Sequence, residues 1–238
     1  MPERVLITGG AGFIGRAVTA ELLKRGHSVR ILDSLIEQVH GDREKPSDLS
    51  RDAELIVGDI RNRDVVMWAV RDVDSVIHLA AEVGVGQSMY AVERYTSVNE
   101  TGSAVLFETL IDNPVRRVVT GSSMSIYGEG LYKDAAGTLV ENAERKPRTS
   151  SAQSWDPADS RGRPLTPLAT PEWKRPSLAS IYPLGKYVQE RQTLIMTQAY
   201  GMEGACLRLF NVYGPGQALS NPYTGVLAIF SSRLLNGQ

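Results

Sequence analysis

The sequence contains one cysteine, little net charge and no long apolar run. A single cysteine among 238 residues cannot form an internal disulfide, so we expect a reducing, cytoplasmic location. The formal net charge of −1 disfavours a nucleic-acid-binding protein, which needs a basic surface. No stretch reaches the roughly 18 apolar residues of a membrane span. The first ten residues lead directly into a predicted strand, so we also expect no export signal.

Short apolar runs alternate with stretches of helical spacing over the first 128 residues. Residues 4–8 are typical of a buried strand, and apolar residues recur at helical spacing over 13–25. We expect further strands at 27–33, 53–59, 74–81 and 115–123, and helices at 65–71 and 91–111. This alternation predicts an α/β fold with a parallel sheet covered by helices on both faces.

The alternation stops after Gly128. Residues 129–176 hold six of the 12 prolines and show no periodicity. We interpret them as a surface insertion, which is either a lid over the site or a disordered segment without a role. Its Trp155 and Trp173 either anchor the segment, which we favour, or stack on a sugar. Order is expected to resume with a helix over 177–200, a strand over 204–214 and a helix over 226–235.

Glycines at Gly9, Gly12 and Gly15 lie between the first predicted strand and helix. Glycine permits a tight turn there and lets backbone N–H groups approach a pyrophosphate. Asp33 ends the second strand 18 residues after Gly15, where a carboxylate accepts hydrogen bonds from ribose hydroxyls and repels a 2′-phosphate. The pattern therefore predicts a Rossmann-type doubly wound sheet that binds NAD rather than NADP. The neighbouring candidate cofactor contacts are Phe13, Ile14 and Ser34.

Two further sets of residues have a functional and a structural interpretation. Asp59 and Ile60, at the end of the third strand, either hold the adenine edge or form a strand-end turn. Tyr182 and Lys186 lie four apart on a predicted helix and so share one face, either as an ordinary amphipathic pair or as a catalytic pair. A positive charge beside a phenol lowers its pKa, and such a tyrosine can act as a general base.

Several motifs together resemble the extended short-chain dehydrogenase/reductase family. They are TGGAGFIG, Asp33, HLAA, Asn99, SSMSIYG, YPLGK and LFNVYGPGQ, and they cover nearly the whole chain outside 129–176. Within that family the chain is similar to the nucleotide-sugar epimerases and dehydratases, in the branch of UDP-glucose 4-epimerase and dTDP-L-rhamnose 4-epimerase-like enzymes. The resemblance implies an NAD-binding core at 1–128, a catalytic helix and strand at 177–217, and the start of a substrate-binding region at 218–238.

The resemblance also implies a role for each matching residue. Tyr182 is the base, Lys186 tunes it and binds ribose, and Ser123 is the hydroxyl partner. Asn99 supports the local hydrogen-bond network, and Asn211 contacts the diphosphate. The remaining implied cofactor contacts are Leu79, Ala80, Ala81 and Ser122, and the remaining implied substrate contacts are Val85, Ser88, Ser125, Asn221 and Val226. No metal site is expected, because His27, His40 and His78 show no ligand spacing.

The implied reaction is a 4-epimerisation of a UDP- or dTDP-sugar through transient C4 oxidation. Dehydratases of the family carry an Asp-Glu pair after the active hydroxyl, because elimination needs an acid and a base. Met124 and Ser125 stand there in this chain, so standard 4,6-dehydratase chemistry is disfavoured. Gly185 replaces the usual serine before Lys186.

Three hypotheses remain open at this point. The first is the NAD-dependent 4-epimerase. The second is a dehydratase, decarboxylase or keto-reductase that uses the same Tyr182 and Lys186. The third is a catalytically weak NAD-binding module, suggested by a substrate region that is short for the family. The family also implies a homodimer through a four-helix bundle of the helices near 91–111 and 177–200, although these helices could equally pack on their own sheet.

Overall fold

The computed structural model describes residues 1–41, 46–145, 155–217 and 226–237. Its internal contacts divide the chain into two units. Unit 1 comprises residues 1–123 and 180–238. Unit 2 comprises residues 124–179.

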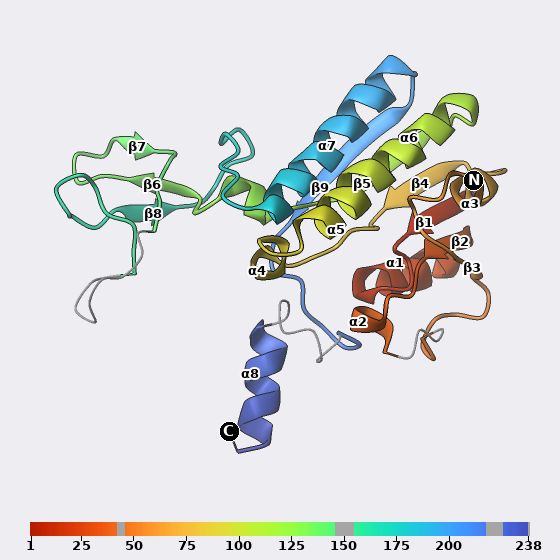
Figure 1. The fold of residues 1–238 in the computed structure, drawn as a ribbon, viewed down its shortest axis with the longest axis horizontal. Helices are drawn as coiled ribbons and strands as arrows, with labels where there is room; N and C mark the ends of the chain where they lie inside the picture. Colours follow the sequence, from red (N-terminus) through yellow and green to blue (C-terminus); the bar gives the residue numbers. More distant parts are fainter. Residues whose placement is uncertain (42–45, 146–154, 218–225, 238) are drawn as a thin grey trace. The chain divides into compact units, whose positions relative to one another are not determined.

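Unit 1 is built on a six-stranded parallel sheet in the order β3-β2-β1-β4-β5-β9 (Figure 1). This is the strand order of a Rossmann fold, so the predicted fold class is confirmed. The central strand β1 is in register with both neighbours, with Val5 opposite Val29 on β2 and Ser75 on β4. The strands are β1 (Arg4–Thr8), β2 (Ser28–Asp33), β3 (Glu54–Val57), β4 (Ser75–His78), β5 (Arg117–Ser123) and β9 (Glu203–Leu209).

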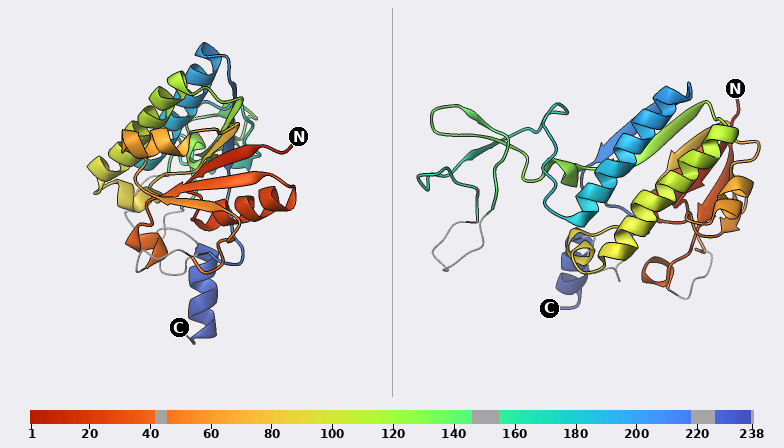
Figure 2. Two further views of the ribbon diagram at one scale, coloured as in Figure 1. Left: turned by 90° about the vertical axis from the view of Figure 1, so that its right-hand side faces the viewer. Right: turned by 45° about the horizontal axis from the view of Figure 1, so that its top comes forward.

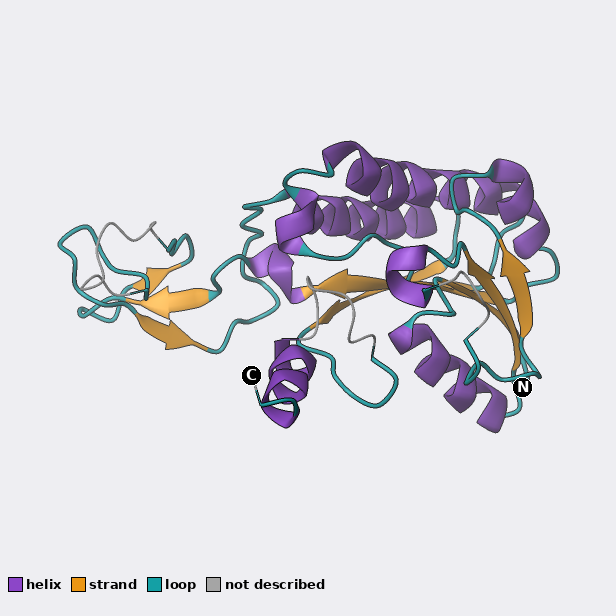
Figure 3. Cartoon of the chain, turned by 60° about the horizontal axis from the view of Figure 1, so that its bottom comes forward, coloured by secondary structure: helices purple, strands orange, loops and turns teal. Residues whose placement is uncertain are grey.

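Helices cover both faces of this sheet (Figure 3). Side chains alternate along β1, so Val5 and Ile7 pack with α1 while Leu6 packs with α3 and α6. No helix within the described ranges is long and apolar enough to cross a membrane. The helices of unit 1 are α1 (Phe13–Lys24), α2 (Glu37–His40), α3 (Arg63–Ala69), α4 (Val85–Ser88), α5 (Val92–Thr96), α6 (Gly102–Asp112), α7 (Ile181–Ala199) and α8 (Val226–Leu235).

We expected a single helix over 91–111, and this prediction is wrong in one respect. A π-helical turn, Ser97–Thr101, separates α5 from α6. Asn99 lies in this turn, fully buried, and its side chain binds the backbone of Glu82. Turns of this kind occur frequently at functional sites. The apolar spacing of the sequence did not reveal the turn, because one extra residue barely alters a helical pattern.

Helix α7 packs on the sheet through polar side chains. Its buried residues include Lys186, Gln189, Glu190, Thr193 and Thr197, and it lies along α6 in two views (Figures 1 and 2). Each polar group meets a partner on the sheet or on the helix itself. Thr193 contacts Thr120 at 2.7 Å, and Glu190 accepts hydrogen bonds from Ser122 at 2.8 Å and from Arg208 at 2.6 Å.

Unit 2 contains a three-stranded antiparallel sheet in the order β7-β6-β8. Its strands are β6 (Leu131–Lys133), β7 (Leu139–Val140) and β8 (Thr166–Leu168), and Tyr132, Ala143 and Leu165 form a small core. We expected an irregular segment here. Strands of two or three residues are too short to show a period of two, which explains why the sequence did not reveal them. Trp155 and Trp173 are each 61% exposed, so neither is a buried anchor.

Two turns of unit 2 share one hydrogen-bond pattern. Asp134 Oδ1 accepts from the N–H groups of Ala136 and Thr138, both at 2.9 Å. Asp159 Oδ1 accepts from Arg161 and Arg163 at the same distances. Gly137 and Gly162 occupy the same place in each turn with φ of 86° and 76°. The Asp134 and Asp159 carboxylates therefore hold the two turns through hydrogen bonds to the backbone.

The stability of the Asp159 turn should depend on pH. Hydrogen bonds from the Arg163 N–H lower the pKa of Asp159 below its usual 3.8. A lowered folded pKa means that the stabilisation is complete above the unfolded value and is lost as the pH falls through the folded value. We expect Asp159→Ala to accelerate amide exchange at Arg161 and Arg163 at neutral pH and to leave Ala136 and Thr138 unchanged. Asp134→Ala is the matched control, and equal effects of either variant on both turns would contradict local carboxylate control.

The Glu190–Arg208 pair should be a large contributor to the attachment of α7. Removing one partner of a buried ion pair costs about 3–5 kcal/mol, because the other charge is left unpaired. We expect Arg208→Met to lower the free energy of unfolding by about this amount. The double variant Glu190→Gln/Arg208→Met should recover most of the loss, because glutamine still accepts from Ser122. Additive losses in denaturant titration would show that the two side chains act independently.

Candidate active site

The predicted site residues of unit 1 gather at the carboxyl-terminal edge of the sheet. Gly9 follows β1, Asp33 ends β2, Leu79 follows β4 and Ser123 ends β5. Parallel strands present their carboxyl ends at one edge, and ligands of such sheets bind there.

The glycine loop is closely packed between β1 and α1. A Cβ on Gly9, which has φ of 70°, would lie 2.7 Å from Ala80 N, and one on Gly15 would lie 2.5 Å from Gly10 Cα. Gly12 precedes α1 and offers no side chain to cap the helix. The N–H groups of the first turn, which begins with Phe13 and Ile14, are therefore not capped by that residue. Such a helix start suits a phosphate group.

Asp33 joins the glycine loop to the end of β2. Its carboxylate is buried and accepts hydrogen bonds from Ala11 N at 3.0 Å and Leu35 N at 2.9 Å. A carboxylate has about four acceptor positions, so capacity remains for ribose hydroxyls. His40 Nε2 lies 3.6 Å from Asp33 Oδ1, and burial lowers the pKa of His40 despite that carboxylate. No sequence pattern indicated this contact, because α2 is too short to be predicted. Ser34 is exposed.

The Asp59 side chain takes part in a turn at the end of β3, which is the structural one of its two interpretations. Its Oδ1 accepts a hydrogen bond from Arg61 N at 2.8 Å, and its Oδ2 pairs with the Arg61 guanidinium at 2.6 Å. Ile60 is buried in the core. The adenine contact of this segment stays a prediction.

The segment that follows β4 is held from the π-helical turn. Asn99 Oδ1 accepts from Glu82 N at 2.7 Å, and its Nδ2 donates to Glu82 O at 3.1 Å. Both polar atoms of the amide are thus used to hold the backbone. Leu79, Ala80 and Ala81, which precede Glu82, are partly buried, and Leu79 and Ala80 lie against Gly9 of the glycine loop.

Tyr182 is fixed at the start of α7 by three neighbours. Its N–H donates to Ser88 Oγ at 3.1 Å, and its ring meets the Tyr95 ring edge to face with centroids 6.5 Å apart. The Ser123 hydroxyl hydrogen-bonds its phenol. Burial raises the pKa of Tyr182, and the bond from Ser123 opposes that rise. The lowering of this pKa by Lys186, which we expected from the sequence, stays a prediction.

Lys186 is buried one helical turn after Tyr182. Its Nζ donates to Gln189 Oε1 at 2.7 Å, and burial lowers its pKa to about 8. His78 is also fully buried, between Thr8 Oγ1 at 2.7 Å and Ser103 Oγ at 2.8 Å. Burial and the Lys186 charge lower the pKa of His78 to about 3, so His78 is neutral at physiological pH.

The structure does not gather every predicted contact. Ser122 donates to Glu190 Oε2, and Ser88 donates to Val85 O while accepting from Tyr182, so both hydroxyls serve internal contacts. The remaining predicted contacts stay predictions: Val85 is 49% exposed, Asn211 lies exposed beyond β9, Ser125 belongs to unit 2, Val226 begins α8, and Asn221 lies outside the described residues.

Sequence reasoning missed Tyr95 and Gln189. Tyr95 lies four residues before Asn99, and Gln189 lies three residues after Lys186. Helical spacing to a candidate site residue would have placed each of them on the relevant face.

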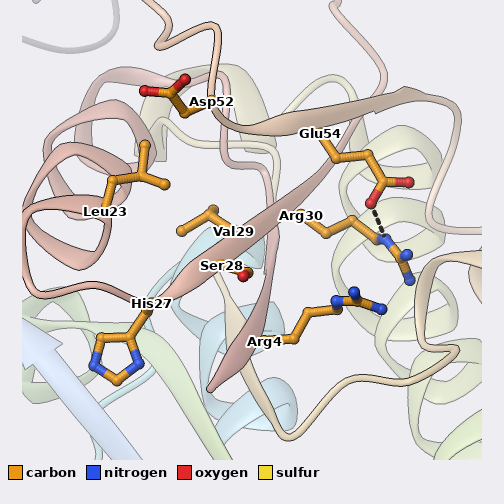
Figure 4. Close-up of a pocket in the computed structure, with 8 residues that line it drawn as sticks. All are labelled: Arg4, Leu23, His27, Ser28, Val29, Arg30, Asp52 and Glu54. Atoms are coloured by element: carbon orange, nitrogen blue, oxygen red, sulfur yellow. Dashed lines mark hydrogen bonds and ion pairs between the residues drawn. The ribbon is translucent and has the colours of Figure 1, made fainter. Parts of the chain in front are cut away.

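A separate cavity lies at the opposite edge of the sheet, near the amino-terminal ends of β1, β2 and β3 (Figure 4). It measures about 220 Å³. Arg30 lines it, but the guanidinium is already engaged by Glu54 at 2.8 Å and by the carbonyls of Ala69 and Arg71. Its lining gives no indication of a catalytic site.

Known proteins match this chain over nearly its whole length. The model of the NAD dependent epimerase/dehydratase family matches residues 5–154 and 157–238. The dTDP-L-rhamnose 4-epimerase of Burkholderia thailandensis is 35% identical over 233 residues, which cover 96% of this chain and 63% of that protein. The chain thus spans less than two thirds of the length of this relative.

Solved structures agree in fold. UDP-glucose 4-epimerase from Thermotoga maritima, solved with UDP-glucose, has a TM-score of 0.76 at 28% identity and covers 99% of this chain and 64% of that one. The UDP-glucose 4-epimerase of Thermus thermophilus, solved with NAD, has a TM-score of 0.71 at 30% identity and covers 98% of this chain and 63% of that one. A dTDP-glucose 4,6-dehydratase from Streptomyces venezuelae, solved with NAD, has a TM-score of 0.69 at 27% identity and covers 98% of this chain and 62% of that one.

Gly15→Ala should destabilise unit 1. Alanine improves helix propensity by up to about 1 kcal/mol. The added Cβ would nevertheless meet backbone atoms of Gly10 at 2.5–2.7 Å, which cannot move aside as a side-chain end can. Overpacking of this kind costs about 1–3 kcal/mol, so we expect a net loss in denaturant titration. Gly12→Ala is the matched control, since its Cβ would meet only Gly9 O at 3.3 Å. A stabilised Gly15→Ala protein would contradict the close packing.

Proposed function

Because the chain belongs to the NAD-dependent epimerase/dehydratase family, we propose that it carries the catalytic core of a nucleotide-sugar 4-epimerase. The observation that carries the proposal is the hydrogen bond between Ser123 and Tyr182 beside the buried Lys186. These three groups share the sheet edge with the glycine loop and Asp33. The activity is a proposal for the whole protein, because the chain covers 63% of the relative's length.

The residues at the sheet edge fit NAD. The start of α1 suits the pyrophosphate, and Asp33 retains acceptor capacity for the ribose hydroxyls. A carboxylate at this position disfavours the 2′-phosphate of NADP. When bound, NAD supplies the redox chemistry by taking a hydride from the sugar and returning it to the other face. The proposed contacts are Gly9, Gly12, Phe13, Ile14, Gly15, Asp33, Ser34, Asp59, Ile60, Leu79, Ala80, Ala81, Asn99, Ser122, Tyr182 and Lys186.

The chain itself handles the proton. Tyr182 Oη accepts the proton of the sugar C4 hydroxyl during oxidation and returns it during reduction. Ser123 Oγ orients the hydroxyl and stabilises the phenolate by donating to it. Lys186 in its charged form adds a positive charge one helical turn away. Because burial raises the pKa of Tyr182, these two groups are needed to make its deprotonated form accessible.

The substrate that we propose is a UDP- or dTDP-linked sugar. The relatives named above are described as acting on dTDP-L-rhamnose and UDP-glucose. A dehydratase is also among the structural neighbours. Met124 and Ser125 favour epimerisation over elimination, because a thioether cannot donate a proton and an unactivated hydroxyl is a poor acid or base. The proposed substrate contacts are Val85, Ser88, Ser123, Ser125, Tyr182, Asn211, Asn221 and Val226.

We further propose a homodimer through α6 and α7. These helices lie side by side over the sheet (Figure 2). Ile111, Leu184 and Ile195 are 37%, 40% and 54% exposed on them, which leaves apolar surface for a second copy. The cytoplasmic location stays a prediction from the single cysteine.

Tyr182→Phe tests the catalytic assignment. Loss of a general base lowers turnover by about 10²- to 10⁴-fold, so we expect that loss on a panel of UDP- and dTDP-sugars analysed by chromatography. Retained NAD, measured after denaturing the purified protein, should be unchanged. Tyr187→Phe, on the same helix, is the matched control and should keep full turnover. Ser123→Ala should move the pH profile of turnover to higher pH, because it removes a bond that lowers the pKa of Tyr182.

Two results would overturn parts of the proposal. Unchanged turnover in Tyr182→Phe would remove this residue from the catalytic machinery. Retained NAD without turnover of any sugar in the wild-type chain would instead support the cofactor-binding module. Loss of water from the sugar, seen by mass, would identify a dehydratase.

A further inference from the structure

Gln189 is a buried polar residue that the proposed proton transfer does not use. It lies on α7 three residues after Lys186 and is 0% exposed. Its Oε1 accepts a 2.7 Å hydrogen bond from Lys186 Nζ. Its Nε2 donates to Ser103 Oγ at 2.8 Å and to Ala80 O at 3.2 Å. One side chain therefore connects the lysine to α6 and to the segment after β4.

The partners of Gln189 fix the orientation of its amide. A flipped amide would present its NH₂ group to the Lys186 ammonium, so that two donors would face each other. It would also present its oxygen to Ala80 O, so that two acceptors would face each other. Both contacts are unfavourable in a buried site, where polar groups need partners. Oε1 is therefore held toward Lys186 Nζ.

The charged groups around Lys186 do not provide it with a counter-ion. His78, from β4, is neutral, because its pKa lies at about 3. Cys206, from β9, partly opposes the lowering of the Lys186 pKa, but burial raises the pKa of its own thiol to about 11, so the thiol is neutral at physiological pH. On α7 itself, burial keeps Tyr182 protonated, and Glu190 is paired with Arg208. Within the described part of the chain, Gln189 Oε1 is the only hydrogen-bond acceptor for Nζ.

We propose that Gln189 is the positioning residue for Lys186, holding Nζ through a neutral acceptor where a carboxylate would pin its charge. The role of Lys186 beside Tyr182 rests on the proposed function, whereas the contact itself does not. An ammonium group has three donors, and Gln189 takes one of them. Two donors stay available to a ribose and to the reacting oxygen. A neutral acceptor also lets Lys186 change charge near physiological pH.

The titration of Lys186 tests this inference without substrate. The full chain is labelled with lysine carrying ¹³C at Cε, and its spectra are followed from neutral to alkaline pH. Lys186→Arg identifies the signal, which we expect to titrate at about pH 8 in the wild type. Gln189→Met removes the acceptor and should lower this midpoint. Gln189→Glu supplies an opposite charge and should raise it by about one to three pH units.

Two controls separate positioning from general destabilisation. Gln192→Met changes the next glutamine of α7, whose amide donates to Glu100 O at 3.4 Å, so it should leave the midpoint unchanged. The Lys174 signal, from a buried lysine of unit 2, should be unchanged in every variant. Gln189→Glu decides the question if Gln189→Met does not fold.

Each failure is distinguishable. An unchanged Lys186 midpoint in folded Gln189→Glu would overturn the inference and leave the proposed function untouched. Shifted midpoints together with full turnover in Tyr182→Phe would overturn the proposed function and leave the positioning role of Gln189 standing.

Discussion

The hydrogen-bonded polar contact between α7 and the sheet is the constraint on which the candidate site depends. An ordinary sheet-covering helix buries an apolar stripe, which tolerates small shifts. Helix α7 instead buries Lys186, Gln189, Glu190 and two threonines, and each must meet its partner or leave an unpaired buried group at a cost in stability. Directional bonds to β5, β9 and α6 therefore fix the position of α7 along its axis. That position places Tyr182 against Ser123.

Hydrogen bonds also hold the carboxyl-terminal edge of the sheet, where we propose that NAD binds. Asp33, Asn99 and the Ser88 hydroxyl bind backbone groups of neighbouring segments rather than solvent. Each bond connects two segments that are distant in sequence, so the edge is organised before a ligand arrives. Preorganisation of this kind lowers the entropic cost of binding, because the contacting groups are already ordered. It also explains why several hydroxyls near the site already have partners within the protein.

The sequence predicted the parts of the fold that repeat a period. Parallel strands and the helices between them followed from apolar spacing, and the glycine loop and Asp33 followed from their places relative to β1 and β2. The strands of unit 2, the helix α2 and the π-helical turn were missed, because each is too short to repeat. His40 was missed for another reason, because its importance comes from a contact with a distant segment, which a linear pattern does not encode. Tyr95 and Gln189 could have been found from their helical spacing to Asn99 and Lys186.

Burial gives Tyr182 and Lys186 opposite shifts, and this has a consequence for the proton. It raises the pKa of the phenol above its ordinary value and lowers that of the ammonium to about 8, so the phenol holds a proton more tightly than the amine does. A neutral phenol with a neutral amine holds one proton, as does a phenolate with an ammonium. A neutral partner such as Gln189 leaves Lys186 able to give up its proton, whereas a carboxylate would hold the proton on the lysine. The polar contact of α7 thus sets both the position and the proton affinity of the pair.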